Sequence, residues 1–270
     1  FPINGKDRTP AWISERMLRE YFLPTFEEGI KAGAPTIMVN SGEVDGIPVH
    51  SDYHLLTEVL RGELKFDGVV VSDWEDIARL FTRDKVANSP KDAVRMAVMA
   101  GIDMSMVPYN FSFYEHLLEL AKEGTVPVKR IDEAVSRILK VKVQLGLFEN
   151  PYPDKTMKEK LPVDEFTKIN LQAATESITL VKNEDNILPL QKDKKILVTG
   201  PTANMLSVMN GGWTITWQGN EETLYPQEKF TVLEAIREEV GTDNVVYVEG
   251  STFAEEKNIQ AAVDAAKNID

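Results

Sequence analysis

A hydroxyl, a carboxylate and an indole follow a short apolar run in the first half of the chain. Residues 68–71 read Gly-Val-Val-Val, and Ser72, Asp73 and Trp74 come directly after them. Three consecutive Val residues are typical of a strand buried on both faces, as in parallel sheets covered by helices. Chemistry in such sheets lies at the carboxyl ends of the strands. Asp73 is therefore a candidate catalytic carboxylate, beside an aromatic ring that suits a sugar.

The alternative for Asp73 is structural. Glu75 and Asp76 follow in the first turn of a predicted helix, and an Asp at this position commonly caps the free N–H groups of a helix. These residues alone leave both roles, cap and catalyst, open.

A second candidate is the Gly-rich stretch 211–219, in which Trp213 and Trp217 are four residues apart. Most other residues here are polar or Gly, so the stretch is predicted to be a loop rather than a core element. Two Trp residues on a loop indicate a stacking surface for a ligand. The alternative is that both fill an interface between two domains.

The three His residues do not predict a metal site. His50 and His54 are four residues apart, but no Glu lies between them in the metalloprotease arrangement and no third ligand is near. Both are predicted to be helix-surface residues, and His116 to be structural. Residues 200–204 lack the spacing of a phosphate loop. We therefore expect no metal and no cofactor.

The composition of the chain excludes several classes of binding partner and of chemistry. The 270 residues carry a formal net charge of −13, which argues against nucleic acid and anionic membranes and is compatible with a neutral ligand. No apolar run approaches the roughly 18 residues of a membrane span. The chain has no Cys, so disulfides and thiolate chemistry are excluded.

The elements that must position these residues follow from periodicity and from Gly and Pro signals. Pro24 is expected to interrupt the first helix, and the helix over 131–144 is expected to turn Ile131, Val135, Ile138 and Leu139 inward. Helices are predicted over residues 12–32, 51–61, 75–81, 90–100, 113–122, 131–144, 166–176, 232–240 and 254–268. Strands are predicted over 35–40, 68–72, 102–107, 195–200 and 245–249, with a hairpin formed by 178–181 and 187–190.

Strands and helices alternate, which predicts an α/β fold, either a barrel or a doubly wound sheet. Residues 150–154, Asn-Pro-Tyr-Pro-Asp, break the pattern and precede a charged stretch. We therefore divide the chain into a first domain over 1–150, a linker over 151–165 and a second domain over 166–270. The lack of an initiator Met, and a last helix that leads toward another strand, make us expect a segment of a longer polypeptide.

Several stretches in the same order resemble glycoside hydrolase family 3, in its β-glucosidase and exo-β-glucan glucohydrolase branch. They are residues 71–74, 100–106, 146–152, 173–183, 188–190 and 211–219. The resemblance implies the C-terminal part of a (β/α)8 TIM-like barrel, followed by the start of an α/β (αβα) sandwich domain. It also implies a periplasmic or secreted protein.

The resemblance further implies retaining hydrolysis that releases glucose from the non-reducing ends of β-linked glucosides or gluco-oligosaccharides. Asp73 matches the nucleophile position. Trp74, Trp213 and Trp217 match substrate-binding aromatics. Arg79 and Met106 fall on positions that line the sugar subsites.

Two motifs of the family have no counterpart here. Its Lys-His pair would precede Phe1, and its acid/base Glu would follow Asp270, so the remainder of the enzyme is expected on both sides. Glu249 matches no catalytic motif, and the aromatic that the plant-type pattern places near Ser41 is missing. The alternatives are a β-N-acetylhexosaminidase of the same family and a non-catalytic carbohydrate-binding protein. Whether the protein forms a homo-oligomer is left open.

Overall fold

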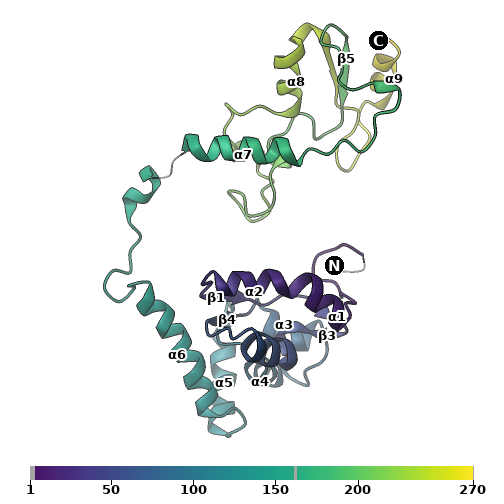
Figure 1. Ribbon diagram of the computed structural model, residues 1–270. Helices are drawn as coiled ribbons and strands as arrows, with labels where there is room; N and C mark the ends of the chain where they lie inside the picture. The colour runs from purple at the N-terminus through teal and green to yellow at the C-terminus, as the bar shows by residue number, and fades with distance from the viewer. Residues whose placement is uncertain (1–3, 161–162, 270) are drawn as a thin grey trace. The chain divides into compact units, whose positions relative to one another are not determined.

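The chain forms two compact units, Phe1–Leu161 and Pro162–Asp270, in a computed structural model that describes residues 4–160 and 163–269 (Figure 1). Each unit has its own buried apolar cluster and is described by itself. Within the described ranges, no helix combines the length and the hydropathy needed to span a bilayer.

The first unit alternates helices with short strands. Its helices and strands are α1 (Glu15–Met17), α2 (Leu23–Lys31), β1 (Thr36–Met38), β2 (Glu43–Val44), β3 (Ile47–Pro48), β4 (Val69–Val71), α3 (Asp76–Thr82), α4 (Pro90–Ala100), α5 (Ser112–Lys122) and α6 (Val128–Gln144). π-Helical segments cover Leu18–Phe22 and His54–Glu63, and 3₁₀ turns cover Val49–Ser51 and Lys155–Lys160. The break expected at Pro24 is confirmed, because α2 begins beside it and the preceding turn is π-helical.

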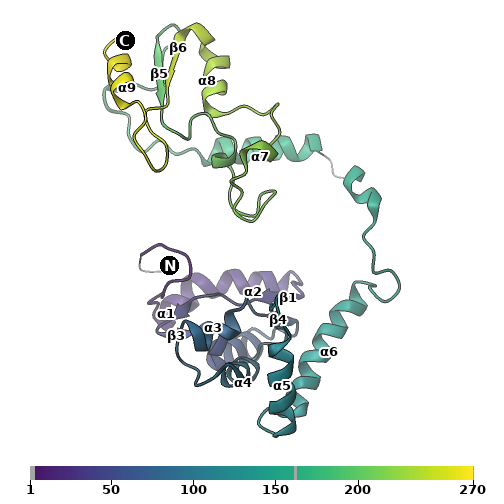
Figure 2. The ribbon, with the colours of Figure 1, turned by 180° about the vertical axis from the view of Figure 1, so that it is seen from behind.

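Strands β1 and β4 pair in parallel, with Ile37 opposite Val70. Val70 is fully buried, as its apolar run predicts. Helix α4 lies between α3 and α5 and contacts both (Figures 1 and 2). α4 follows its local signals closely, because the Ser89 side chain accepts from the Asp92 N–H, Pro90 is the first helical residue and Gly101 ends the helix at a φ of 127°.

Residues 102–107, predicted to form a strand, form only a single β-bridge. Only Met104 forms a β-bridge, to Val71, and the Ser72 N–H donates to the Met104 carbonyl at 2.9 Å. Two residues later the Met106 N–H donates to the Ser72 hydroxyl at 2.8 Å instead of to a backbone carbonyl. The side chain of Ser72 therefore replaces the next ladder bond, and the strand does not continue.

Helix α6 turns only part of the predicted face inward. Ile131 packs against the core and Ile138 is half-buried, whereas Val135 and Leu139 are 46% and 45% exposed and Ala134 is buried. Arg130 and Arg137, on the same side as Ala134, both reach the buried carboxylate of Asp103 at 2.9 and 3.0 Å. Because these charge-assisted contacts orient α6, its apolar periodicity alone does not determine which side faces the core.

Gly68 allows β4 to begin where it does. A Cβ at this position would lie 2.3 Å from the Pro35 carbonyl oxygen and 2.5 Å from the Phe66 ring. We expect Gly68→Ala to lower the free energy of unfolding by about 1–3 kcal/mol, because backbone and a buried ring must shift. Urea denaturation measures this change. Gly29→Ala, in α2 with open space around it, is the control and should be neutral or slightly stabilising. Equal effects of the two substitutions would contradict the steric explanation.

The second unit contains one parallel pair of strands with a helix on each side (Figures 1 and 2). Its elements are α7 (Val163–Ser177), β5 (Ile196–Thr199), α8 (Val232–Val240), β6 (Val245–Val248) and α9 (Ile259–Ala266), with 3₁₀ turns at Glu184–Asn186, Ser207–Met209, Glu222–Leu224 and Thr242–Asn244. Thr231 and Glu234 form a capping box at the start of α8. Leu233 is the most deeply buried residue of this unit's core.

Two predictions for this unit are wrong. Residues 178–190 form no hairpin, because both the carbonyl and the amide of the Asn183 side chain bond the backbone of Leu188, at 2.9 and 3.0 Å, in place of a strand partner. Helix α9 begins at Ile259 rather than at residue 254. Asn258 bonds the Gly250 N–H through its side chain at 2.6 Å, which holds the preceding residues in a loop.

Candidate active site

The turn after β4 is held in place by the segment around Met106. Ser72 is fully buried and receives the Met106 N–H, and the Glu75 N–H donates to the Met106 carbonyl at 2.9 Å. Residues 72–75 are therefore bonded to the segment around Met104 and Met106 on both sides of Asp73. Met106, a predicted subsite residue, contributes its backbone to this support.

Asp73 does not cap α3. The N-cap residue is Glu75, at a φ of 60°, and no side chain caps this helix. One carboxylate oxygen of Asp73 accepts from the adjacent Trp74 N–H at 2.5 Å, and the Asp73 N–H donates to His50 Nε2 at 3.0 Å. The structural alternative considered for Asp73 is wrong, and its carboxylate remains available for chemistry.

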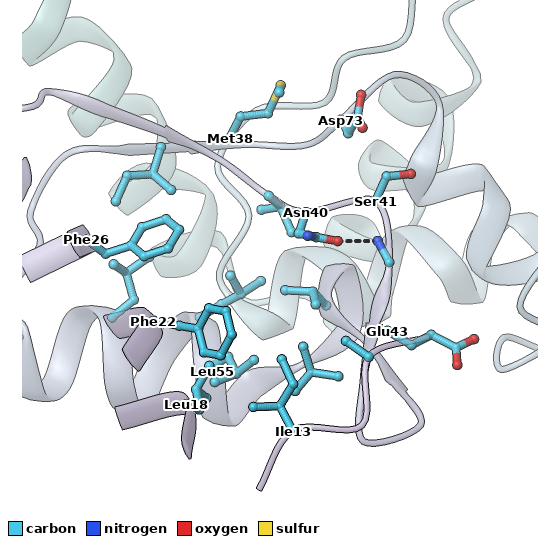
Figure 3. Close-up of a pocket in the computed structure, with 18 of the residues that line it drawn as sticks. Ile13, Leu18, Phe22, Phe26, Met38, Asn40, Ser41, Glu43, Leu55 and Asp73 are labelled. Carbon is cyan, nitrogen blue, oxygen red and sulfur yellow. Dashed lines mark hydrogen bonds between the residues drawn. The ribbon is translucent and has the colours of Figure 1, made fainter. Parts of the chain in front are cut away.

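Asp73 lines a cavity of about 630 Å³ in the first unit. Figure 3 shows its carboxylate on the same side of the cavity as Ser41 and Met38, with Phe22 and Leu18 on the far side. The lining is mainly apolar, with a few polar groups near Asp73, which is the usual composition of a small-molecule site. Asp73 is therefore part of the wall of a cavity whose composition suits a small molecule.

Arg8 is the cation nearest to Asp73. Its Nη2 lies 3.8 Å from Asp73 Oδ2, and its own backbone is left-handed, with a φ of 58°. The Asp73 side chain is 21% exposed, so the pair stays partly open to solvent. Arg8 lines the same cavity as Asp73, so a cation and the carboxylate stand together on its wall.

Trp74 stands next to a second aromatic ring. It packs edge-on against Tyr109 with the ring centroids 5.8 Å apart, and Trp74 is 42% and Tyr109 72% exposed. An edge-to-face pair fixes the plane of each ring, so Trp74 offers a defined flat surface beside Asp73. Tyr109 was not identified from the sequence, since a single aromatic after Pro108 carries no spacing signal.

Trp213 and Trp217 lie together in one loop of the second unit. The Trp213 N–H donates to the Trp217 carbonyl at 2.9 Å, and the two indoles are 82% and 64% exposed. Trp213 and Ile215 both have positive φ, which is uncommon for large side chains and costs energy. Within their own unit the two rings are therefore held out from the core by a strained, hydrogen-bonded loop.

The two neighbouring His residues have separate environments. His54 is exposed and pairs with Glu58 at 2.7 Å, as predicted for a helix surface. The same prediction is wrong for His50, which is 2% exposed on the turn Val49–Ser51, because that turn folds inward against α3 and α4. Burial lowers the pKa of His50 to about 4, so the imidazole is neutral at pH 7. Among the described residues, no three or more His, Asp or Glu side chains cluster in a way that could hold a metal ion.

Arg79 faces its own helix. Its guanidinium pairs with the buried carboxylate of Asp76, one turn earlier in α3. Its place in a sugar subsite stays a prediction. Glu249, to which no role is assigned, pairs with Lys257 at 2.5 Å.

Sequence reasoning missed His50, Arg8 and Asp103. For the first two the sequence carries no spacing signal, because their relation to Asp73 exists only after folding. Asp103 had a signal: a carboxylate inside an apolar run is seldom buried without a partner.

Comparisons with known proteins agree with the motifs. Residues 3–141 match the glycosyl hydrolase family 3 N-terminal domain, and residues 178–270 match the C-terminal domain of that family. A lysosomal beta glucosidase from Dictyostelium discoideum is 47% identical over 100% of the chain and 34% of its own length. A periplasmic beta-glucosidase from Salmonella typhimurium is 35% identical over 94% of the chain and 33% of its own length.

Solved structures are similar along nearly all of the chain. The β-glucosidase from Listeria innocua in complex with glucose has a TM-score of 0.77 and 32% identity, covering 97% of this chain and 34% of that one. An exo-1,3/1,4-β-glucanase from a Pseudoalteromonas species has a TM-score of 0.75 and 29% identity, covering 92% of this chain and 32% of that one. The chain spans about a third of the length of the curated relatives it matches.

Proposed function

The chain belongs to glycoside hydrolase family 3, and from this premise we propose that the whole protein is a retaining, exo-acting β-glucosidase with Asp73 as its nucleophile. The observation that carries the proposal is the uncapped carboxylate of Asp73 at the carboxyl end of β4, on the wall of a cavity. The named relatives, β-glucosidases and an exo-glucanase, support the same activity. They do not favour the hexosaminidase or the non-catalytic alternative.

In the proposed reaction an Asp73 oxygen attacks the anomeric carbon, while the bond from that carbon to the leaving-group oxygen breaks. The leaving oxygen takes a proton from a second carboxyl group. Water then attacks the anomeric carbon, gives its proton to that group, and releases glucose and free Asp73. We assign the second group to the family's acid/base Glu and to no residue of this chain.

The proposed architecture has the first unit as the later part of a (β/α)8 barrel and the second as the start of an αβα sandwich. The parallel pairs β1–β4 and β5–β6, each followed by helices, support this proposal. The domain bounds proposed are 1–150 and 166–270, joined by the linker 151–165.

The proposed substrates are neutral β-linked glucosides or gluco-oligosaccharides. The chain carries a net charge of −13, which would repel an anionic substrate but does not oppose the binding of a neutral sugar. A location in the periplasm, outside the cell or in a lysosome-like compartment is supported by the names of the two curated relatives.

Labelling with an activated 2-deoxy-2-fluoro-glucoside tests this proposal. The reagent should add one glycosyl group to the full-length protein, on the peptide that contains Asp73. Mass spectrometry before and after treatment shows the adduct. A full-length protein that takes up no label and hydrolyses no aryl β-glucoside would contradict the proposal.

Trp217 is proposed to bind the sugar that follows the reacting one. Trp217→Ala should weaken binding of gluco-oligosaccharides by about 1–3 kcal/mol, because a ring-sized apolar contact is lost. The KM of the full-length enzyme for a disaccharide and for a longer substrate measures this effect. Phe253→Ala, an exposed aromatic on another loop of the same unit, should leave both values unchanged. Unchanged kinetics in Trp217→Ala would remove Trp217 from the site.

A further inference from the structure

The buried side chain of His50 contacts the backbone of the proposed nucleophile, Asp73. The proposed reaction assigns no step to this side chain. Its Nε2 accepts the Asp73 N–H at 3.0 Å. Only a neutral imidazole with an unprotonated Nε2 can accept this bond. The hydrogen bond therefore requires one particular tautomer of His50.

The groups behind the ring favour that tautomer. His50 Nδ1 faces the Asp76 Oδ2 atom at 3.9 Å, and this buried oxygen has no hydrogen-bond partner among the described residues. The other oxygen of Asp76 pairs with Arg79. A carboxylate opposite Nδ1 keeps the imidazole proton there and leaves Nε2 as the acceptor.

We infer that His50 is a positioning residue for the proposed reaction: by accepting the Asp73 N–H it fixes the turn from which the carboxylate attacks. Two segments far apart in sequence meet at this point: Val49–Ser51 presents the ring, and the stretch that runs from the end of β4 into α3 supplies both the Asp73 N–H and Asp76. A displacement of the reacting group by about 1 Å can cost about 10²-fold in rate. The inference rests on the proposed function.

The hydrogen bond between His50 and Asp73 also makes the stability of the folded protein depend on pH on the acid side. Burial lowers the pKa of His50 to about 4; Asp76, Asp73 and Asp84 act to raise it, and Arg83 acts to lower it further. In the unfolded chain the His50 imidazole titrates near its ordinary pKa of 6.5. The stabilisation from keeping His50 neutral is thus complete above pH 6.5 and is lost as the pH falls toward 4. Below about 4 a proton on Nε2 would face the Asp73 N–H, and the hydrogen bond would break.

The test compares variants of the full-length enzyme at pH 7. His50→Gln keeps an acceptor oxygen at about the reach of Nε2 and cannot become charged. His50→Asn carries the same amide one methylene shorter, so it cannot reach the Asp73 N–H. His50→Leu fills the space without an acceptor, and His54→Gln is the control, because His54 is exposed and four residues away.

We expect His50→Asn and His50→Leu to lower kcat, and the rate of labelling by an activated 2-deoxy-2-fluoro-glucoside, by about 10²-fold, with KM changed much less. His50→Gln should recover at least about tenfold of that loss. Its thermal unfolding should fall less steeply than that of the wild type between pH 6.5 and 4, because the contribution of His50 to that slope is removed. His54→Gln should behave as wild type. Circular dichroism confirms that each variant is folded. If His50→Leu does not fold, the comparison of Gln with Asn decides the question.

Two results would overturn the inference. One is wild-type labelling in folded His50→Asn or His50→Leu. The other is a His50→Gln variant that is folded yet as slow as His50→Asn, which would show that the accepted hydrogen bond is not what matters. Failure of the proposed function is distinguishable, because it would appear as turnover in an Asp73→Asn enzyme.

Discussion

Asp73→Asn in the full-length enzyme is expected to lower the turnover of an aryl β-glucoside by at least about 10³-fold while leaving the fold and sugar binding nearly unchanged. The substitution is isosteric. The neutral amide can still bond its own turn, but it cannot attack the anomeric carbon. Because Asp73 caps no helix, no loss of stability is expected to accompany the loss of rate. Steady-state kinetics and a thermal melt measure the two effects.

A rescue experiment identifies the cause of that loss. Asp73→Ala in the presence of azide should recover turnover and form an α-glucosyl azide, since a small anion replaces the carboxylate and attacks once with inversion. Glu75→Gln, a carboxylate in the same turn, is the matched control and should keep most of its activity. An Asp73→Asn enzyme with more than a few per cent of the wild-type rate would remove Asp73 as the nucleophile.

Asp103→Asn is expected to lower the free energy of unfolding by about 3–5 kcal/mol. The Asp103 carboxylate is fully buried and receives Arg61 at 2.6 Å, Arg130 at 2.9 Å and Arg137 at 3.0 Å. It also accepts the Val70 N–H of β4 at 3.1 Å. A neutral amide would leave three guanidinium groups without an anion. Urea denaturation of the full-length protein measures the change.

Asp67→Asn is the control for this prediction. Asp67 pairs with Lys140 of α6 at 2.5 Å, but its side chain is 80% exposed, so the loss should be about 1 kcal/mol or less. If both substitutions had equally small effects, the Asp103 cluster would not be holding α6 against β4.

Much of this protein was predictable from local signals. β4 follows from its run of Val, α4 from Ser89 and Gly101, and α8 from the strongly periodic stretch after Thr231. Each depends on residues a few positions apart, which act before the chain has folded. The ordered motifs also led to glycoside hydrolase family 3, to which the chain belongs, whereas the roles of Asp73 as nucleophile and of the Trp pair as a sugar surface stay proposals.

The failed predictions involve side chains that compete with the backbone or with apolar packing. Ser72 takes the hydrogen bond that would have continued the strand at Met106, and Asn183 bonds Leu188 where a hairpin was expected. Arg130 and Arg137 turn α6 so that Val135 and Leu139 of its predicted apolar face stay exposed. Periodicity and propensity do not describe such contacts.

The sequence by itself determined the family, the order of most helices and strands, and which residue types stand after β4. Only the tertiary structure decided what Asp73 does locally: that it caps no helix, that it lines a cavity, and that its N–H is bound by His50, 23 residues earlier. The same holds for the link from Asp103 to Arg61, 42 residues away. The reason is physical, because these bonds are worth making only where burial excludes water, and burial arises when distant segments pack together.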